Sequence, residues 1–223
     1  MTVPAIAVAF IVLLAGYVVA GEGLGVHASA ASITLLDQGR QQAATRTAVS
    51  MYAAGRSPRG GMRFGRETAV ILGGGAPLVP EIAIDLTETQ HMQGFVRART
   101  PANFETLALR SARERLVVHR DGDRVDVVNG LGGTITSLTL HSRSKRYRLS
   151  APLTNGERRT LEPTSVVEPP VGGGHPYAAR FAGVTPAEES YVAVLDRSPF
   201  WQSGTDTVIE HDSVHVVIGV LEP

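Results

Sequence analysis

The sequence contains no cysteine, which excludes a disulfide framework, thiolate metal ligands and a cysteine nucleophile. Aromatic residues make up only 5% of the chain, which argues against a platform for stacking sugar rings. An excess of charge is missing too, because Lys plus Arg and Asp plus Glu number 21 each. No net field therefore steers the chain towards nucleic acid. We expect no nucleic-acid partner, and no motif indicates a cofactor.

One long apolar run stands at the N-terminus. Residues 3–20 read VPAIAVAFIVLLAGYVVA without a charge, close to the shortest helix that spans about 30 Å of hydrocarbon. The run predicts a transmembrane anchor. A cleaved signal peptide is the alternative, because Val18 and Ala20 are side chains that a signal peptidase accepts before Gly21; a buried helix of a soluble protein is the third. We expect a single-pass membrane protein with an extracytoplasmic C-terminal part, periplasmic or extracellular.

The remainder of the chain has the pattern of β-strands. Apolar residues recur with period two, and Gly or Pro separates the runs. Ile82, Ile84 and Leu86 alternate with Ala83 and Asp85, as in a strand with one solvated face. Further strands are predicted at Ala31 to Leu36, Thr45 to Tyr52, Thr68 to Leu72, Gly94 to Arg99, Leu107 to Arg110, Ser190 to Leu195 and Ser213 to Leu221. In the last of these, the pattern predicts a buried face of Val214, Val216, Ile218 and Val220.

A hairpin is the clearest local prediction. The segments LVVHR and DRVDVV flank Asp121-Gly122, a dipeptide suited to a type I′ turn. A two-residue loop there pairs Arg120 with Asp123 and Val118 with Val125. The predicted register places Leu116, Val118, Val125 and Val127 on one face.

Residues 115–163 resemble the immunoglobulin-like β-sandwich modules of envelope proteins. The resemblance rests on a strand ending in Val128-Asn129, a strand from Ile135 to Leu140, a strand from Arg146 to Leu149, and Asn155-Gly156-Glu157 before Leu161. It implies a sandwich fold. The paired cysteines and the core tryptophan of true immunoglobulin domains are absent, so it implies no specific function.

Two histidines near the C-terminus are candidate metal ligands. In a strand, EHDSVH places His211 and His215 on one side, and zinc or copper would need further ligands such as His175 or Asp196. A metal-dependent hydrolase using His211 and His215 is therefore one alternative function. The competing interpretation is that these polar residues mark the start of a strand that enters the core.

A basic stretch offers a second alternative function. Arg143, Lys145, Arg146 and Arg148 could contact an anion such as a lipid headgroup or an acidic glycan, although solvated strand faces carry such residues routinely. The glycine runs at 73–75 and 172–174 lack the lysine of a phosphate-binding P-loop and are better explained as turns.

The sequence thus predicts an all-β protein, an N-terminal transmembrane or signal helix followed by antiparallel β-sandwich-type structure. The expected regions are an anchor at 1–25, a membrane-proximal β region at 26–100, an immunoglobulin-like part at 101–163, a Pro/Gly-rich linker or loop at 164–186, and C-terminal strands at 187–223. No local motif indicates an enzyme. The leading hypothesis is a non-enzymatic structural or interaction module that binds the membrane through residues 3–20 and other envelope proteins through its β structure.

Overall fold

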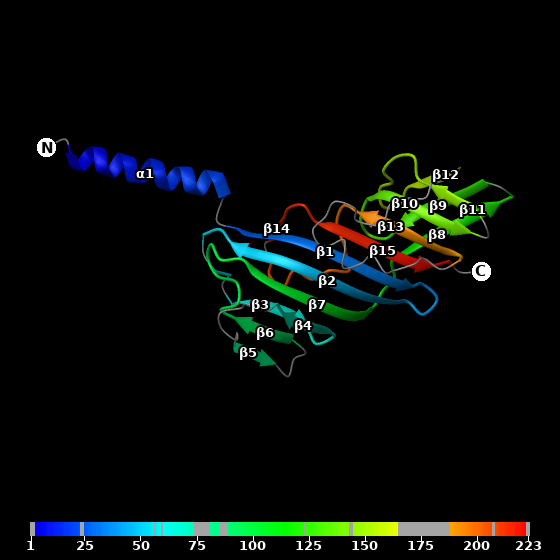
Figure 1. Ribbon diagram of the computed structural model, residues 1–223, viewed down its shortest axis with the longest axis horizontal. Coiled ribbons are helices and arrows are strands. Elements are labelled where there is room, and N and C mark those ends of the chain that lie inside the picture. Colours follow the sequence, from blue (N-terminus) through cyan, green and yellow to red (C-terminus); the bar gives the residue numbers. More distant parts are fainter. Residues whose placement is uncertain are drawn as a thin grey trace.

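The computed structural model describes residues 3–22, 25–55, 57–58, 60–73, 81–84, 89–122, 124–142, 145–164, 188–206 and 208–221. These form one helix and fifteen strands (Figure 1). The elements are α1 (Val3–Glu22), β1 (Val26–Asp37), β2 (Gln42–Ala53), β3 (Met62–Gly65), β4 (Thr68–Leu72), β5 (Glu81–Ile84), β6 (Thr89–Gln93), β7 (Ala102–Ser111), β8 (Arg115–Asp121), β9 (Arg124–Gly130), β10 (Ile135–Ser142), β11 (Lys145–Arg148), β12 (Arg158–Thr164), β13 (Ser190–Leu195), β14 (Val208–Glu210) and β15 (Val214–Val220).

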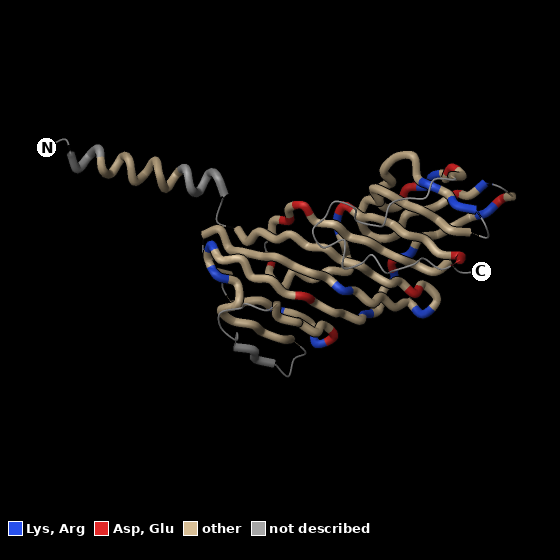
Figure 2. Tube along the Cα trace, in the orientation of Figure 1, with Lys and Arg blue, Asp and Glu red and all other residues tan. Residues whose placement is uncertain are grey.

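Helix α1 extends away from the β structure, with the N-terminus at its far end (Figure 1). Apolar side chains in its middle are exposed, among them Phe10 at 66% and Leu13 at 72%. Its described side chains carry no charge, whereas charged residues are scattered over the strands (Figure 2). Among the residues that the structure describes, no helix is both long enough and apolar enough to cross a membrane.

The strands confirm a predominantly β protein built around one large sheet. Its order is β4-β7-β2-β1-β15-β13-β10-β11-β12-β9-β8, and β14 pairs with β1 in addition. Most neighbours are antiparallel, but β1 runs parallel to both β14 and β15. The sheet is therefore mixed, and the expectation of a purely antiparallel architecture is wrong. Both C-terminal strands occupy the side of β1 that β2 leaves free.

A smaller antiparallel sheet, ordered β3-β6-β5, packs beside the large one. In Figure 1 it lies below β2 and β7. Met62, Phe64 and Met92 of this sheet join a cluster with Met51 and Phe104 of the large sheet. The contact buries one face of the N-terminal half of the large sheet.

Most predicted strands are present. β4 and β13 have the predicted ends, and the predicted segments 31–36, 45–52, 107–110 and 135–140 lie inside β1, β2, β7 and β10. The predicted strand from Gly94 to Arg99 is wrong: β6 ends at Gln93, because Gly94 turns the chain with φ of 70°. The strand around Ile82 is present as β5, while Leu86 lies outside the described residues.

The predicted buried face of β15 is buried only in part. Val216 is 3% exposed, but Val214 and Ile218 are half-buried and Val220 is 58% exposed. The opposite face, with Val217 and Gly219, is the fully buried one. Glycine is required at 219 because a Cβ there would lie 2.3 Å from the ring of Tyr191 on β13. Alternation misled because the more completely buried face, with His215, Val217 and Gly219, is the less apolar one in the sequence.

The β8–β9 hairpin is present, but its turn is shifted by one residue. Asp121 pairs with Arg124 and Val118 with Val127, so β8 continues to Asp121 and the turn does not begin there. Gly122 has φ of 59°, which explains why the turn centres on it. A turn shifted by one residue moves each pairing partner by two positions, for example from Val125 to Val127 opposite Val118. Because side chains alternate with period two, Leu116, Val118, Val125 and Val127 still share a face.

Strands of several predicted regions take part in the same large sheet. β1, β2 and β4 come from 26–100, β7 to β12 largely from 101–163, and β13 to β15 from 187–223. The predicted linker or loop at 164–186 lies, apart from Thr164, outside the described residues. The proposed regional boundaries therefore stay predictions.

Candidate functional site

The large sheet buries two separate apolar clusters on the same face. One contains Leu36 and Val217 and fills the end formed by β8 to β13. The other contains Ala30 and Val49 and packs against the small sheet. Between the two clusters, the face that points inward changes from apolar to polar.

Hydroxyl groups fill this gap in two adjacent rows. Cross-strand pairing places His215, Ser32, Thr47 and Thr106 side by side. The next row pairs Thr34 with Thr45, Thr45 with Ala108, and Ala108 with Thr68. We call the six hydroxyl residues and the histidine the threonine belt: Ser32, Thr34, Thr45, Thr47, Thr68, Thr106 and His215. All seven are buried.

The connection between β13 and β14 covers the belt. Phe200 is buried there, and the neighbouring Trp201 stacks on His215 with ring centroids 6.0 Å apart. Arg110 of β7 lies over the Phe200 ring at 5.2 Å and donates to the Pro199 carbonyl at 2.6 Å. An aromatic cover over buried hydroxyls encloses a small polar space.

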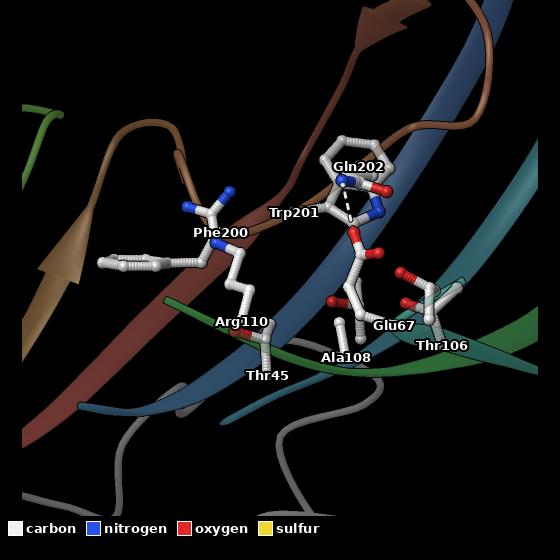
Figure 3. A pocket seen from close by; sticks show the side chains of 10 residues that line it. Thr45, Glu67, Thr106, Ala108, Arg110, Phe200, Trp201 and Gln202 are labelled. Atoms are coloured by element: carbon white, nitrogen blue, oxygen red, sulfur yellow. Dashed lines mark hydrogen bonds between the residues drawn. The ribbon is translucent and has the colours of Figure 1, made fainter. Parts of the chain in front are cut away.

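A pocket lies between this cover and the belt (Figure 3). Its cavity volume is about 10 Å³, room for about one water molecule. Ten residues line it: Thr45, Thr47, Glu67, Thr68, Thr106, Ala108, Arg110, Phe200, Trp201 and Gln202. At its rim Gln202 donates to Glu67 Oε1 at 3.4 Å and accepts from the Gly65 amide at 3.4 Å. Both contacts are long, so the rim is closed only weakly.

Polar atoms without a partner gather at this pocket. In the described part of the chain, five buried side-chain polar atoms lack a hydrogen bond, and four of them belong to pocket residues: Thr47 Oγ1, Thr68 Oγ1, Arg110 Nε and Trp201 Nε1. A buried polar group without a partner costs about 1–3 kcal/mol. The adjoining cavity has about the volume of one water molecule, which is enough to supply hydrogen bonds to several of these atoms.

A chain of three polar side chains lies beside the pocket. Ser32 Oγ lies 2.8 Å from His215 Nδ1, and His215 Nε2 lies 3.5 Å from Glu210 Oε2. The residue types match those of a hydrolytic triad. Ser32 and His215 are 1% and 0% exposed, so a substrate has no access to the hydroxyl. The chain instead gives the buried imidazole partners and joins β1 to β14 and β15.

The predicted metal ligands His211 and His215 contact different partners. β15 begins only at Val214, so His211 lies before the strand, where its Nε2 is 2.9 Å from His27 Nδ1. His27 also stacks on Tyr52 at 5.2 Å. Asp196, a conceivable further ligand, instead accepts from the Thr134 amide at 2.8 Å.

Within the described ranges no group of three or more His, Asp or Glu side chains is arranged to hold a metal. His175, the other conceivable donor, lies outside these ranges. The metal site and the hydrolase that would depend on it stay predictions.

The predicted anion site does not form one surface in the described residues. Arg146 and Arg148 alternate with Lys145 along β11, so Lys145 points to the opposite face. Arg143 lies outside the described residues. Anion binding by this stretch stays a prediction.

Arginines nearby instead surround a carboxylate. Asp126 of β9 accepts from Thr160 Oγ1 at 2.6 Å, from Arg158 at 2.8 Å and from Arg124 at 3.2 Å. These hydrogen bonds, with that of Thr160 the strongest, lower the pKa of Asp126 from 3.8 to about 2. The cluster fastens β9 to β12.

Sequence reasoning missed the threonine belt and Trp201 as its cover. A usable signal was present: Ser32 and Thr34, like Thr45 and Thr47, are spaced two apart within apolar strands. Such spacing puts both hydroxyls of a pair on the same face. The partner of His215 carries no local signal, because Ser32 is 183 residues away in the sequence.

No protein-family model matches the chain, and no curated protein matches it. Among solved structures it is similar to the yeast delta-COP-I mu-homology domain, with a TM-score of 0.36, 6% identity, and coverage of 87% of this chain and 95% of that one. It is also similar to the same yeast domain complexed with a Dsl1 WxWxV peptide, with a TM-score of 0.32, 8% identity and coverage of 87% and 94%. Neither similarity transfers a residue role. The immunoglobulin-like resemblance of residues 115–163 stays a prediction.

The low pKa of Asp126 predicts how acid affects stability. Because its pKa is lower in the folded chain than in the unfolded chain, the carboxylate stabilises the fold above about pH 4, and this stabilisation is lost as the pH falls towards 2. Asp126→Asn should therefore unfold more easily than the unchanged protein at pH 7, and the difference should shrink between pH 4 and pH 2. Urea denaturation across this range measures it. Asp121→Asn, at the exposed end of β8 in the same hairpin, is the control. A difference for Asp126→Asn that is constant with pH would contradict the prediction.

Proposed function

We propose that this chain is a non-enzymatic protein-interaction module that binds an extended segment of a partner protein along the outer edge of β4. The observation that carries the proposal is the uncharged edge of the large sheet, whose outward groups at Val70 and Leu72 face away from β7, while the outward carbonyl of Thr68 accepts from Gln90 Nε2 at 2.6 Å. The sequence of β4 is TAVIL, and among the described strands only β7 pairs with it. Natural edge strands are usually protected by charge, proline or a cover.

The direction of the backbone groups of β4 follows from the bonds at its two ends. The Leu109 amide donates to the Glu67 carbonyl, and the Gly73 amide donates to the Asn103 carbonyl. Because bonding alternates along an antiparallel pair, the odd-numbered residues of β4 bond to β7. Val70 and Leu72 therefore direct their N–H and C=O groups away from the sheet, as strand addition requires.

The other end of the sheet is protected. On β8 the outward amide of Leu116 is taken by Gln38 Oε1 at 2.7 Å, and Arg120 forms an ion pair with Glu189. Charges at 115, 120 and 121 also flank its apolar residues. Only one of the two ends of the described sheet path therefore has the composition of a docking edge.

The face of the sheet next to β4 is apolar and exposed. Ile71 of β4 is 53% exposed, Leu107 and Leu109 of β7 are 49% and 60% exposed, and Leu35 of β1 is 52% exposed. Pairing puts all four on the side opposite the threonine belt. We call this side the outer face. Its one prominent charged feature is the pair Arg46–Glu105 at 2.7 Å. Exposed apolar residues on neighbouring strands are typical of interaction surfaces.

A membrane location is part of the same proposal. It is supported by the uncharged sequence of residues 3–20 and by the exposed apolar side chains in the middle of α1. In this arrangement α1 attaches the chain to a membrane and the β structure lies outside the cytoplasm, where it meets other envelope proteins.

Binding by strand addition is tested with three substitutions. Val70→Pro removes an outward N–H without breaking a bond to β7, and Ile71→Lys adds the charge that natural edges use against pairing. Leu109→Lys adds the same charge to the same face, but on β7, out of reach of an added strand. Peptides selected from a phage-displayed library on the unchanged protein serve as probes.

We expect Val70→Pro and Ile71→Lys to weaken peptide binding by about tenfold or more, since edge hydrogen bonds are lost. Leu109→Lys should bind within about twofold of the unchanged protein. Titration calorimetry gives the affinities, and slower hydrogen exchange at the Val70 amide on binding locates the peptide. Failure to select any peptide, or equal losses from all three substitutions, would overturn the strand-addition mechanism.

The location is tested separately. A C-terminal reporter fused to the full chain should be recovered in the membrane fraction at full length, and external protease should remove it. A shortened soluble product would show that residues 3–20 are a cleaved signal. A reporter protected from protease in intact cells would contradict the extracytoplasmic placement.

A further inference from the structure

The side chain of Gln90 covers one end of the β4 edge. Its amide nitrogen donates to the Thr68 carbonyl at 2.6 Å and to the Gly65 carbonyl at 3.1 Å. A glutamine NH₂ group has two donors, so both are used. Gln90 belongs to β6, the middle strand of the small sheet, where it pairs with Phe64 on one side and Ile84 on the other. The backbone that carries this side chain is therefore held from both sides.

The other end of the β4 edge is open. Thr68, Val70 and Leu72 direct their N–H and C=O groups away from β7, but Gln90 occupies only the carbonyl of Thr68. Among the described residues, no side chain donates to the carbonyl of Val70 or of Leu72. A partner strand that continued past Val70 to Thr68 would need the carbonyl that Gln90 already occupies.

The opposite end of the large sheet has a cap of the same kind. On β8, the outward amide of Leu116 donates to Gln38 Oε1 at 2.7 Å. In both places a glutamine from another part of the chain satisfies a backbone group of an outermost strand. Covering an edge in this way protects it against an added strand. On β4 the protection ends at Thr68, so the edge from Val70 onwards stays available.

On the basis of the strand addition proposed above, we propose that Gln90 sets the register and length of the partner segment that binds at β4. With Gln90 in place, an antiparallel partner pairs with β4 from Val70 to Leu72 only, a stretch of about three residues. Side chains directly opposite each other in such a pair lie on the same face. The central residue of the partner is therefore apolar, because it lies on the outer face beside Ile71, which is 53% exposed.

Gln90→Ala tests the role of the cap. Gln93→Ala is the matched control, since Gln93 is an exposed glutamine on the same strand. The probes are the shortest library-selected peptide that keeps full affinity for the unchanged full chain, and the same peptide lengthened by two residues at either end. Titration calorimetry gives the affinities.

Lengthening the peptide should change its affinity for the unchanged protein and for Gln93→Ala by less than about twofold. With Gln90→Ala, the peptide lengthened towards Thr68 should bind about tenfold more tightly, because further backbone hydrogen bonds form. Changing the central apolar residue of the peptide to aspartate should weaken binding to all three proteins about tenfold. Unchanged binding of that peptide would contradict the contact with Ile71.

Hydrogen exchange gives a second measurement that needs no variant. In the unchanged protein, the short peptide should slow exchange at the Val70 and Leu72 amides and leave the Thr68 amide as it is in the free chain. The role of Gln90 is overturned, and strand addition retained, if a bound peptide protects Thr68 in the unchanged protein. Equal gains from lengthening in all three proteins would have the same meaning. Absence of any peptide binding would remove strand addition itself, and with it the role of Gln90.

Discussion

The burial of hydroxyl groups in the middle of the large sheet is the constraint on which the rest of the structure depends. A strand face that carried only apolar residues would form one continuous core. Here Ser32, Thr34, Thr45 and Thr47 interrupt it, so the sheet has two cores, one towards β8 to β13 and one against the small sheet. Buried hydroxyls need partners. The connection carrying Trp201 covers them, and His215 and the cross-strand threonine pair satisfy part of the set.

The same constraint determines the outer face. Side chains alternate along a strand, so burying Ser32 and Thr34 on β1 turns Leu35 outwards, where it is 52% exposed. In a sheet with one buried and one solvated face, Leu35 would be expected on the buried face and the hydroxyls of Ser32 and Thr34 on the solvated one. A sequence that breaks the rule of burying its apolar residues commonly does so at a functional site. The polar interior and the apolar outer face therefore have one origin, the alternation of side chains along the same strands.

The sequence is sufficient to predict that the chain is built from strands, and where many of them lie. The uncharged strand β4 and the apolar strand β13 are predicted with their correct ends because turn residues bound them. The hairpin turn is off by one residue, since Gly122, and not Asp121, begins the loop. These are local features, and local pattern predicts them well.

The choice of buried face and the parallel pairing of β1 with β15 are not local. On β15, the set with Val216 and Ile218 is more apolar than the set with His215, Val217 and Gly219, so alternation alone favours the less completely buried face. The neighbour across the sheet decides, through the Tyr191 ring above Gly219. The candidate site is not a local feature either, because its residues come from separate parts of the chain. Ser32, Thr68, Thr106 and Trp201 meet only after β1, β4 and β7 have joined one sheet and the connection that carries Trp201 covers it.

The central claim is that hydrogen bonds of the threonine belt join strands at Ser32, Thr34, Thr45 and His215 but not at Thr47, whose buried hydroxyl does not stabilise the fold. The free energy of unfolding of Thr47→Val, measured by urea denaturation without added ligand, tests it most directly. Because the Thr47 hydroxyl is buried and has no partner, replacing it with a methyl group of similar shape should leave stability unchanged or raise it. A loss of more than about 1 kcal/mol would show that the hydroxyl stabilises the folded chain, and would contradict the account.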